Sequence, residues 1–129
     1  MKGLYAAIFE RGDDKVYVSF PDLPGCITSG KDMTEAYEMA VDAANLWMTS
    51  TVEDLNEPVP EATPIERIKY PDGTQVMLIQ IDTEEYLKRT ETKAVRRTVS
   101  IPSWMDQIAQ KRGISLSKVL QEALREQIA

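Results

Sequence analysis

Residues 16–26 read Val-Tyr-Val-Ser-Phe-Pro-Asp-Leu-Pro-Gly-Cys, and the first half of the chain can be organised around them. Val16, Val18 and Phe20 alternate with Tyr17 and Ser19, a period of two that predicts a β-strand over residues 15–20. The two prolines of residues 21–25 predict a stiff turn. Residues 26–28 then predict a short third strand, so the stretch reads as strand, turn and strand.

The segments on either side extend this pattern. Upstream, residues 4–10 predict another strand, and Gly12-Asp13-Asp14 is turn chemistry that joins it to residues 15–20 as a hairpin. Downstream, the periodicity becomes helical from Glu35 to about Leu55, and Thr34 is preferred over Asp32 as the N-cap. One apolar stripe runs along this helix: Ala36, Met39, Ala40, Ala43, Ala44, Trp47 and Met48.

The next segments complete a first domain. Residues 56–64 hold three prolines and predict an extended connector, and Tyr70-Pro71-Asp72-Gly73 predicts a turn. Residues 75–82 form a nearly continuous apolar strand, which is expected to be central in its sheet. A short helix follows over residues 83–88. The fold class is therefore α+β, with an antiparallel sheet and a helix in a domain of residues 1–88.

The charges divide the chain into an acidic and a basic part. The net charge of the 129 residues is −6, but residues 1–87 carry 17 acidic and 6 basic side chains, whereas residues 88–129 carry 4 acidic and 9 basic ones. Two surfaces with different partners would explain this division, because the basic part can approach phosphate and the acidic part can attract a basic protein. The alternative is that the asymmetry only aids solubility.

Several residue types are absent or rare. The chain has no histidine, so a Ser-His-Asp triad, a Cys-His pair and a histidine zinc site are excluded. Cys26 is the only cysteine, no apolar run is long enough for a membrane span, and the first residues do not resemble a signal peptide. We therefore expect a cytoplasmic protein without cofactor, metal or membrane partner. A carboxylate enzyme that uses magnesium stays open.

Residues 94–102 read Ala-Val-Arg-Arg-Thr-Val-Ser-Ile-Pro, which predicts a strand that ends at Pro102. A helix is expected from there to about Arg112, with Gly113 as its left-handed cap. Ser115 is the predicted N-cap of a second helix that extends to about Ile128. We place a linker at residues 89–93 and a second domain at residues 94–129.

About 36 residues are too few to bury a core alone, but two copies that pair their strands would solve this problem. The segment resembles the ribbon-helix-helix family through residues 98–102 and 113–117. The resemblance implies a homodimer whose β-ribbon enters the major groove of double-stranded DNA. The expected DNA contacts are Arg96, Thr98 and Ser100 at base edges, and Ser115, Leu116, Ser117 and Lys118 at phosphate.

Two points leave this interpretation open. Arg96, Thr98 and Ser100 could form a merely solvated strand face. Arg97 stands where the alternation of the strand predicts an apolar residue, so it either extends to the edge of the ribbon or binds the DNA backbone.

The first domain resembles the HicB antitoxin family. The residues that carry the likeness are 5–8, 16–26, Gly30, Glu35-Ala36 and the alanine-rich helix that ends near Trp47-Met48, and it covers most of residues 3–88. The likeness implies a partial ribonuclease-H-like α/β domain without catalytic function. It also implies a HicA partner, a small basic mRNA-cleaving toxin, and repression of the protein's own operon through the second domain. Assemblies larger than a dimer are left open.

Four acids are candidates for toxin contact: Asp22, Glu35, Glu38 and Asp42. Each could instead be a solvated carboxylate, and Asp22 could simply fix its turn.

Two other functions remain as alternatives. One is a ribbon-helix-helix regulator whose first domain senses a small molecule. The other is a metal-dependent nuclease, which would have to cluster acids such as Asp13, Asp14, Asp22 and Asp82.

Overall fold

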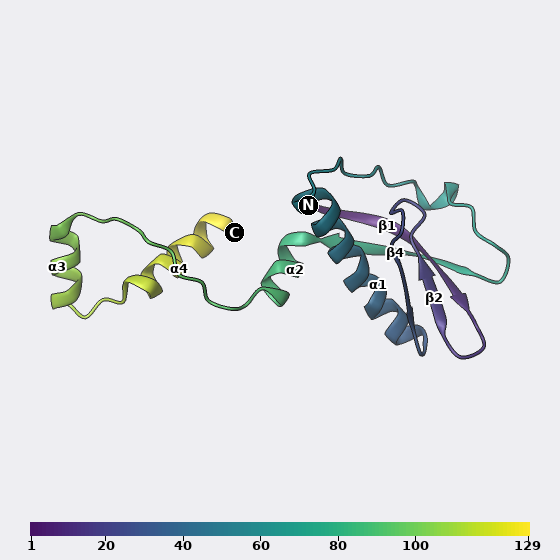
Figure 1. Cartoon of the computed structure of the whole chain (residues 1–129), viewed down its shortest axis with the longest axis horizontal. Coiled ribbons are helices and arrows are strands. Elements are labelled where there is room, and N and C mark those ends of the chain that lie inside the picture. The colour runs from purple at the N-terminus through teal and green to yellow at the C-terminus, as the bar shows by residue number, and fades with distance from the viewer. The chain divides into compact units, whose positions relative to one another are not determined.

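The computed structural model describes residues 1–129, which form two compact units. Unit 1 comprises Met1–Thr92 and unit 2 comprises Lys93–Ala129. Figure 1 shows the elements of both units, coloured along the chain.

The sheet of unit 1 has four strands in the order β3-β2-β1-β4. They are β1 (Lys2–Arg11), β2 (Val16–Ser19), β3 (Ile27–Gly30) and β4 (Gln75–Asp82), and each neighbouring pair is antiparallel. The predicted hairpin of β1 and β2 is confirmed. The central position expected for residues 75–82 is wrong, because β4 pairs only with β1 and lies at the edge of the sheet.

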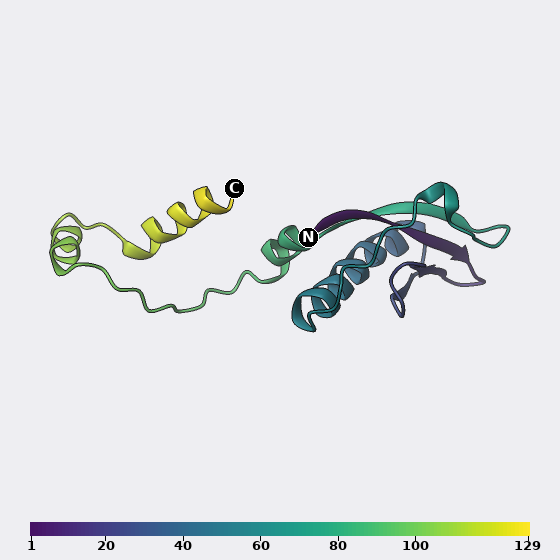
Figure 2. The same ribbon diagram turned by 90° about the horizontal axis from the view of Figure 1, so that it is seen from above.

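Helix α1 (Met33–Met48) packs across one face of this sheet, as Figure 2 shows from above. Its N-cap is Asp32, whose Oδ1 accepts the N–H of Glu35 at 2.8 Å, so the preference for Thr34 was wrong. Gly30 of β3 approaches the first turn of this helix closely, since a Cβ on Gly30 would lie 2.3 Å from the nitrogen of Ala36. The helix ends at Met48 and continues as the π-helix η1 (Thr49–Asp54), earlier than the predicted end at Leu55.

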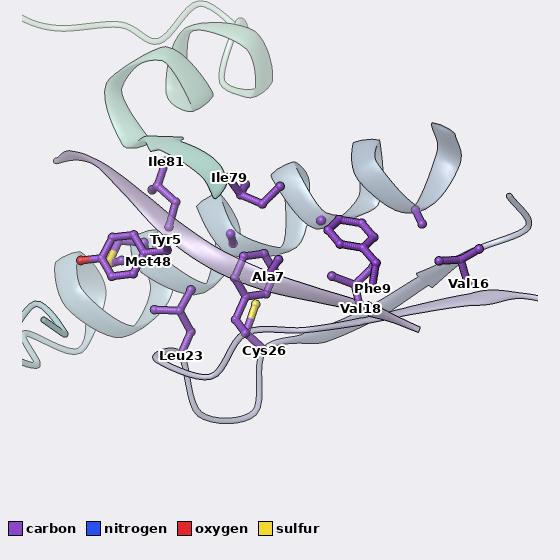
Figure 3. Close-up of a cluster of buried hydrophobic side chains, with 14 residues drawn as sticks. Tyr5, Ala7, Phe9, Val16, Val18, Leu23, Cys26, Met48, Ile79 and Ile81 are labelled. Carbon is purple, nitrogen blue, oxygen red and sulfur yellow. The ribbon is translucent and has the colours of Figure 1, made fainter. Parts of the chain in front are cut away.

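The core of unit 1 lies between α1 and the sheet (Figure 3). Alternate residues of each strand enter it, and the small alanines of the helix let the two layers approach closely. Leu23 and Cys26 close one side, because their loop folds under the end of the helix. The buried residues are Tyr5, Ala7, Phe9, Val16, Val18, Phe20, Leu23, Cys26, Ala36, Ala40, Ala44, Met48, Ile79 and Ile81.

The connector after η1 is fixed to the core by side-chain hydrogen bonds. The Tyr5 hydroxyl donates to the carbonyl of Pro60 at 2.6 Å. The connector then forms the 3-10 helix η2 (Ile65–Arg67) and a turn at residues 71–74 that leads into β4. Helix α2 (Thr83–Thr90) follows β4 directly and is capped by Asp82. The predicted connector, turn and short helix are confirmed.

Unit 2 contains helices α3 (Ser103–Lys111) and α4 (Leu116–Ile128). Gly113 has φ +66° and ends the first helix in the left-handed conformation, as predicted. Ser115 caps the second, again as predicted, and its Oγ accepts the N–H of Lys118 at 3.3 Å. None of the helices in either unit combines the length and apolar character needed to cross a membrane.

Candidate functional site

The residues expected to read DNA bases lie in the extended start of unit 2. Arg96, Thr98 and Ser100 are exposed, and residues 93–102 pair with no other strand of the chain. The apolar residues that alternate with them are also exposed, with Val95 at 79%, Val99 at 60% and Ile101 at 42%. Within one chain, the backbone N–H and C=O groups of this segment therefore have no partner strand, and its apolar side chains stay exposed to water.

The two helices of unit 2 leave a second apolar surface exposed. Ala109 is their only buried apolar residue, and every other apolar side chain of the two helices is exposed. A groove with a mainly apolar lining lies between residues 97–103 and α4. The apolar residues that line it are Val99, Ile101, Ile114, Leu116, Val119, Leu120 and Ala123.

The start of α4 is suited to an anion. Ser115 already satisfies the N–H of Lys118, whereas Leu116 and Ser117 stand in the first turn, where the helix leaves backbone N–H groups free. The positive end of the helix dipole lies at the same place. Lys118 stands in the same turn, so four of the predicted DNA contacts are close together along the chain: residues 115–118.

The four acids expected to contact a toxin fall into two pairs. Asp22 is part of the fold, because its Oδ2 accepts the N–H of Thr63 at 2.8 Å and its Oδ1 accepts the Thr63 hydroxyl at 2.7 Å. Glu35 is also engaged locally: it accepts the N–H of Lys31 at 3.1 Å and forms an exposed ion pair with the same residue. Both acids therefore have structural partners before any toxin binds.

Glu38 and Asp42 form the other pair. They lie one turn apart on α1, both are exposed, and neither has an ion-pair or hydrogen-bond partner in the chain. Asp42 is close enough to α2 to influence Tyr86, whose hydroxyl pKa is raised by partial burial first and by the Asp42 charge second. This pair is the part of the predicted toxin surface that is available to a basic partner.

More exposed acids follow α1 that the sequence reasoning did not single out. Glu53 and Asp54 lie on η1, which continues directly from α1, and Glu57 and Glu61 lie on the connector. The density of acids over residues 53–61 is a signal in the sequence that could have indicated them. Together with Glu38 and Asp42 they give α1 and the segment that follows it an excess of exposed acids.

The carboxylates of the nuclease alternative are not brought together. Asp13 and Asp14 lie in the turn between β1 and β2, Asp22 binds Thr63, and Asp82 caps α2. No three His, Cys, Asp or Glu side chains are clustered closely enough to hold a metal ion. Cys26 is buried in the core, where desolvation raises the pKa of its thiol to about 11, so it stays protonated and unreactive.

The geometry defines an α+β protein in which a helix covers one face of a four-stranded antiparallel sheet and a basic two-helix unit follows. The HicB-like antitoxin family of bacterial toxin–antitoxin systems matches residues 5–124, so the chain belongs to this family. The predicted family is thus confirmed, and its members are regulatory antitoxins, not enzymes.

Individual proteins agree with this assignment. An uncharacterized 14.9 kDa protein from the rep-hol intergenic region of Haemophilus phage HP1 (strain HP1c1) is 30% identical over 101 residues, which cover 78% of this chain and 74% of the phage protein. A toxin–antitoxin complex from Streptococcus pneumoniae contains a chain with the same fold, with a TM-score of 0.60, 20% identity and coverage of 98% and 99% of the two chains. A HicA3 and HicB3 toxin–antitoxin complex matches 62% of this chain and 99% of its own, with a TM-score of 0.51 and 19% identity.

Proposed function

We propose that this antitoxin neutralises a HicA-type mRNA-cleaving toxin through unit 1 and represses its own operon by binding operator DNA through unit 2, as a ribbon-helix-helix dimer. The observation that carries the proposal is the contrast in burial and charge between the units. Unit 1 is acidic and has its own core, whereas unit 2 is basic and leaves almost all of its apolar side chains exposed.

The dimer follows from the needs of unit 2. Its 37 residues cannot bury the side chains that line the groove between residues 97–103 and α4. A second copy would cover that groove and pair residues 94–101 of the two chains as antiparallel strands. The resulting ribbon would present Arg96, Thr98 and Ser100 on its outer side, where they reach base edges in the major groove. Residues 115–118 would bind phosphate and fix the position of the ribbon on the duplex.

The toxin would bind unit 1. HicA-type toxins act on mRNA and are basic, so an acidic helix side attracts them and competes with RNA. Of the four predicted acids, the exposed pair Glu38 and Asp42 would contact the toxin directly. Asp22 and Glu35 would act indirectly, by holding the connector and the start of α1 in place. The assignment of unit 1 as a partial ribonuclease-H-like domain belongs to the same proposal, and so do the domain limits 1–88 and 94–129.

Separating the units tests the proposal. A fragment of residues 1–92 should still protect mRNA from the toxin and should have no affinity for operator DNA, since the two surfaces lie on different units. Full-length protein in the same assays is the control, and circular dichroism establishes that the fragment is folded. A folded fragment that fails to bind the toxin at any concentration contradicts the division of functions, whereas a moderate loss reflects reduced avidity.

A further inference from the structure

Two charged residues line the apolar groove of unit 2. Arg97 lies on the extended segment that leads into α3, and Asp106 lies in the first turn of that helix. The other residues of the lining are apolar apart from three serines, so Arg97 and Asp106 are the only charged groups there. A groove that a second copy is proposed to cover thus contains one cation and one anion.

Asp106 is less exposed than its surroundings. Apart from it and the buried Ala109, every residue of Lys93–Ala129 is exposed, so Asp106 is the only half-buried charged residue of unit 2. Gln110, one turn later on α3, donates its side-chain N–H to Oδ2 of Asp106 at 3.1 Å. The helix dipole favours an acid in the first turn, but it explains neither the burial of this carboxylate nor its place in the groove.

Arg97 is the residue that interrupts the apolar side of the predicted strand. Val95, Val99 and Ile101 share this side by alternation. Arg97 is exposed in one chain, and neither it nor Asp106 has an ion-pair partner there. Covering a charged group costs free energy unless it is paired. A dimer that closes the groove must therefore provide a partner for both side chains.

The register of the proposed ribbon indicates that these partners belong to different copies. An antiparallel ribbon centred on Thr98, the middle of residues 94–102, places Arg97 opposite Val99 of the second copy. With a rise of about 3.4 Å per residue, Arg97 lies about 7 Å along the ribbon from the second copy's Ile101, but about 14 Å from Ile101 of its own chain. Helix α3 begins two residues after Ile101, so the α3 of the second copy starts nearer to Arg97.

We propose that Arg97 of each copy binds Asp106 of the other copy, so that two equivalent ion pairs flank the apolar contact. The inference rests on the proposed ribbon dimer and adds how one copy recognises another. The planar guanidinium suits a carboxylate whose other oxygen is held by Gln110. Breaking a covered ion pair costs more than forming it gains, so the two pairs act mainly against wrong partners and shifted registers, which leave the charges unpaired.

Exchanging the charges between copies tests this. Arg97→Glu makes two acids face each other and Asp106→Arg makes two cations do so. In sedimentation equilibrium of the full chain, each variant alone should raise the dimer dissociation constant at least about tenfold. An equimolar mixture of the two variants should recover the wild-type mass, because each copy then meets the opposite charge on the other.

Two kinds of reference complete the experiment. Val99→Asp gives the mass of the chain when the ribbon contact is lost. Arg112→Glu and Glu126→Arg make the same changes of charge at exposed positions outside the groove, and they should have the wild-type mass both alone and mixed. Recovery in the mixture of groove variants also shows that both variants are able to fold.

The outcomes separate the ion pair from the dimer. If Val99→Asp keeps the wild-type mass, the ribbon dimer of the proposed function is wrong and the inference fails with it. If Val99→Asp dissociates the chain but Arg97→Glu and Asp106→Arg do not, only the inference is overturned. It is also overturned if both exchanges within one chain restore the mass while the mixture does not, since the pair then lies within one copy. An Arg97→Gln variant that keeps its mass but loses affinity for duplex DNA would assign Arg97 to the DNA backbone instead.

Discussion

Unit 1 and unit 2 differ in where their stability comes from. Unit 1 closes a core of 14 buried residues between its helix and sheet, and its loops are held by hydrogen bonds such as that of Tyr5 to Pro60. Unit 2 has two well-capped helices, yet only Ala109 is buried. The comparison shows that good local signals, such as caps and turns, can build helices without building a stable domain. Unit 1 has a core of its own, whereas in the proposed function unit 2 depends on association with a second copy.

Charge makes the same division. Residues 1–87 carry 17 acidic and 6 basic side chains, whereas residues 88–129 carry 4 acidic and 9 basic ones. In the proposed function, repression and toxin inhibition need opposite surface potentials, and placing them on separate units lets each be tuned alone. Four variants test how complete this separation is.

The largest effect is expected for Val99→Asp. It would bury an unpaired charge at the ribbon, at a cost of about 3–5 kcal/mol, which is enough to dissociate the dimer. DNA binding, measured by fluorescence anisotropy, should be lost, while the thermal unfolding of unit 1 should be unchanged. Gln121→Asp, an equally exposed position on the polar side of α4, serves as the control. Retained operator affinity for Val99→Asp would show that unit 2 does not need its partner.

Gly30→Ala is the corresponding test of unit 1. The new Cβ would lie 2.3 Å from the Ala36 nitrogen, so either β3 or the start of α1 must move. We expect a loss of unfolding free energy of about 3 kcal/mol, the upper range for overpacking. Chemical denaturation of the full chain measures it. Gly73→Ala is a control with open space around its Cβ, although its φ of +83° gives it a smaller cost. Operator binding should persist at temperatures where the variant's unit 1 remains folded.

Arg96→Ala tests recognition without association. The loss of a bidentate base contact should weaken operator binding by about 1–3 kcal/mol, roughly 5- to 150-fold, while the dimer stays intact. Arg125→Ala, an arginine at the far end of α4, is the matched control. Unchanged binding of Arg96→Ala at moderate salt would mean that the polar strand face is only solvated.

The smallest effect is expected for Glu38→Gln combined with Asp42→Asn. The association rate with a HicA-type toxin should fall several-fold at low salt, and the difference should shrink as salt is raised, because exposed charges act over a distance set by screening. Surface plasmon resonance measures the association rate and the dissociation rate. Glu122→Gln with Glu126→Gln removes the same charge at the same spacing from α4 of unit 2. If this control slows association equally, the effect comes from net charge and not from α1.

Local patterns were sufficient for much of the structure. Alternation located β1 and β2, and Gly113 and Ser115 fixed the ends of the unit 2 helices, because these signals act within a few residues. The resemblance in residues 16–26 was sufficient for the family. Asp22 was more difficult: a role in fixing its own turn could be predicted, but its hydrogen-bond partner Thr63 is 41 residues away, so nothing nearby in the sequence indicated that it holds the connector.

What the sequence determined by itself is the list of elements, the caps of the unit 2 helices and the split between an acidic and a basic part, since propensity, periodicity and charge are properties of short segments. Tertiary structure alone decided which strand lies at the edge, which residue caps α1 and which acids stay free. These depend on how far the layers approach, as Gly30 against Ala36 illustrates, and on which side chains meet across the fold. The apolar run of residues 76–79 predicted a central strand, and only the pairing of the strands in three dimensions showed that β4 lies at the edge.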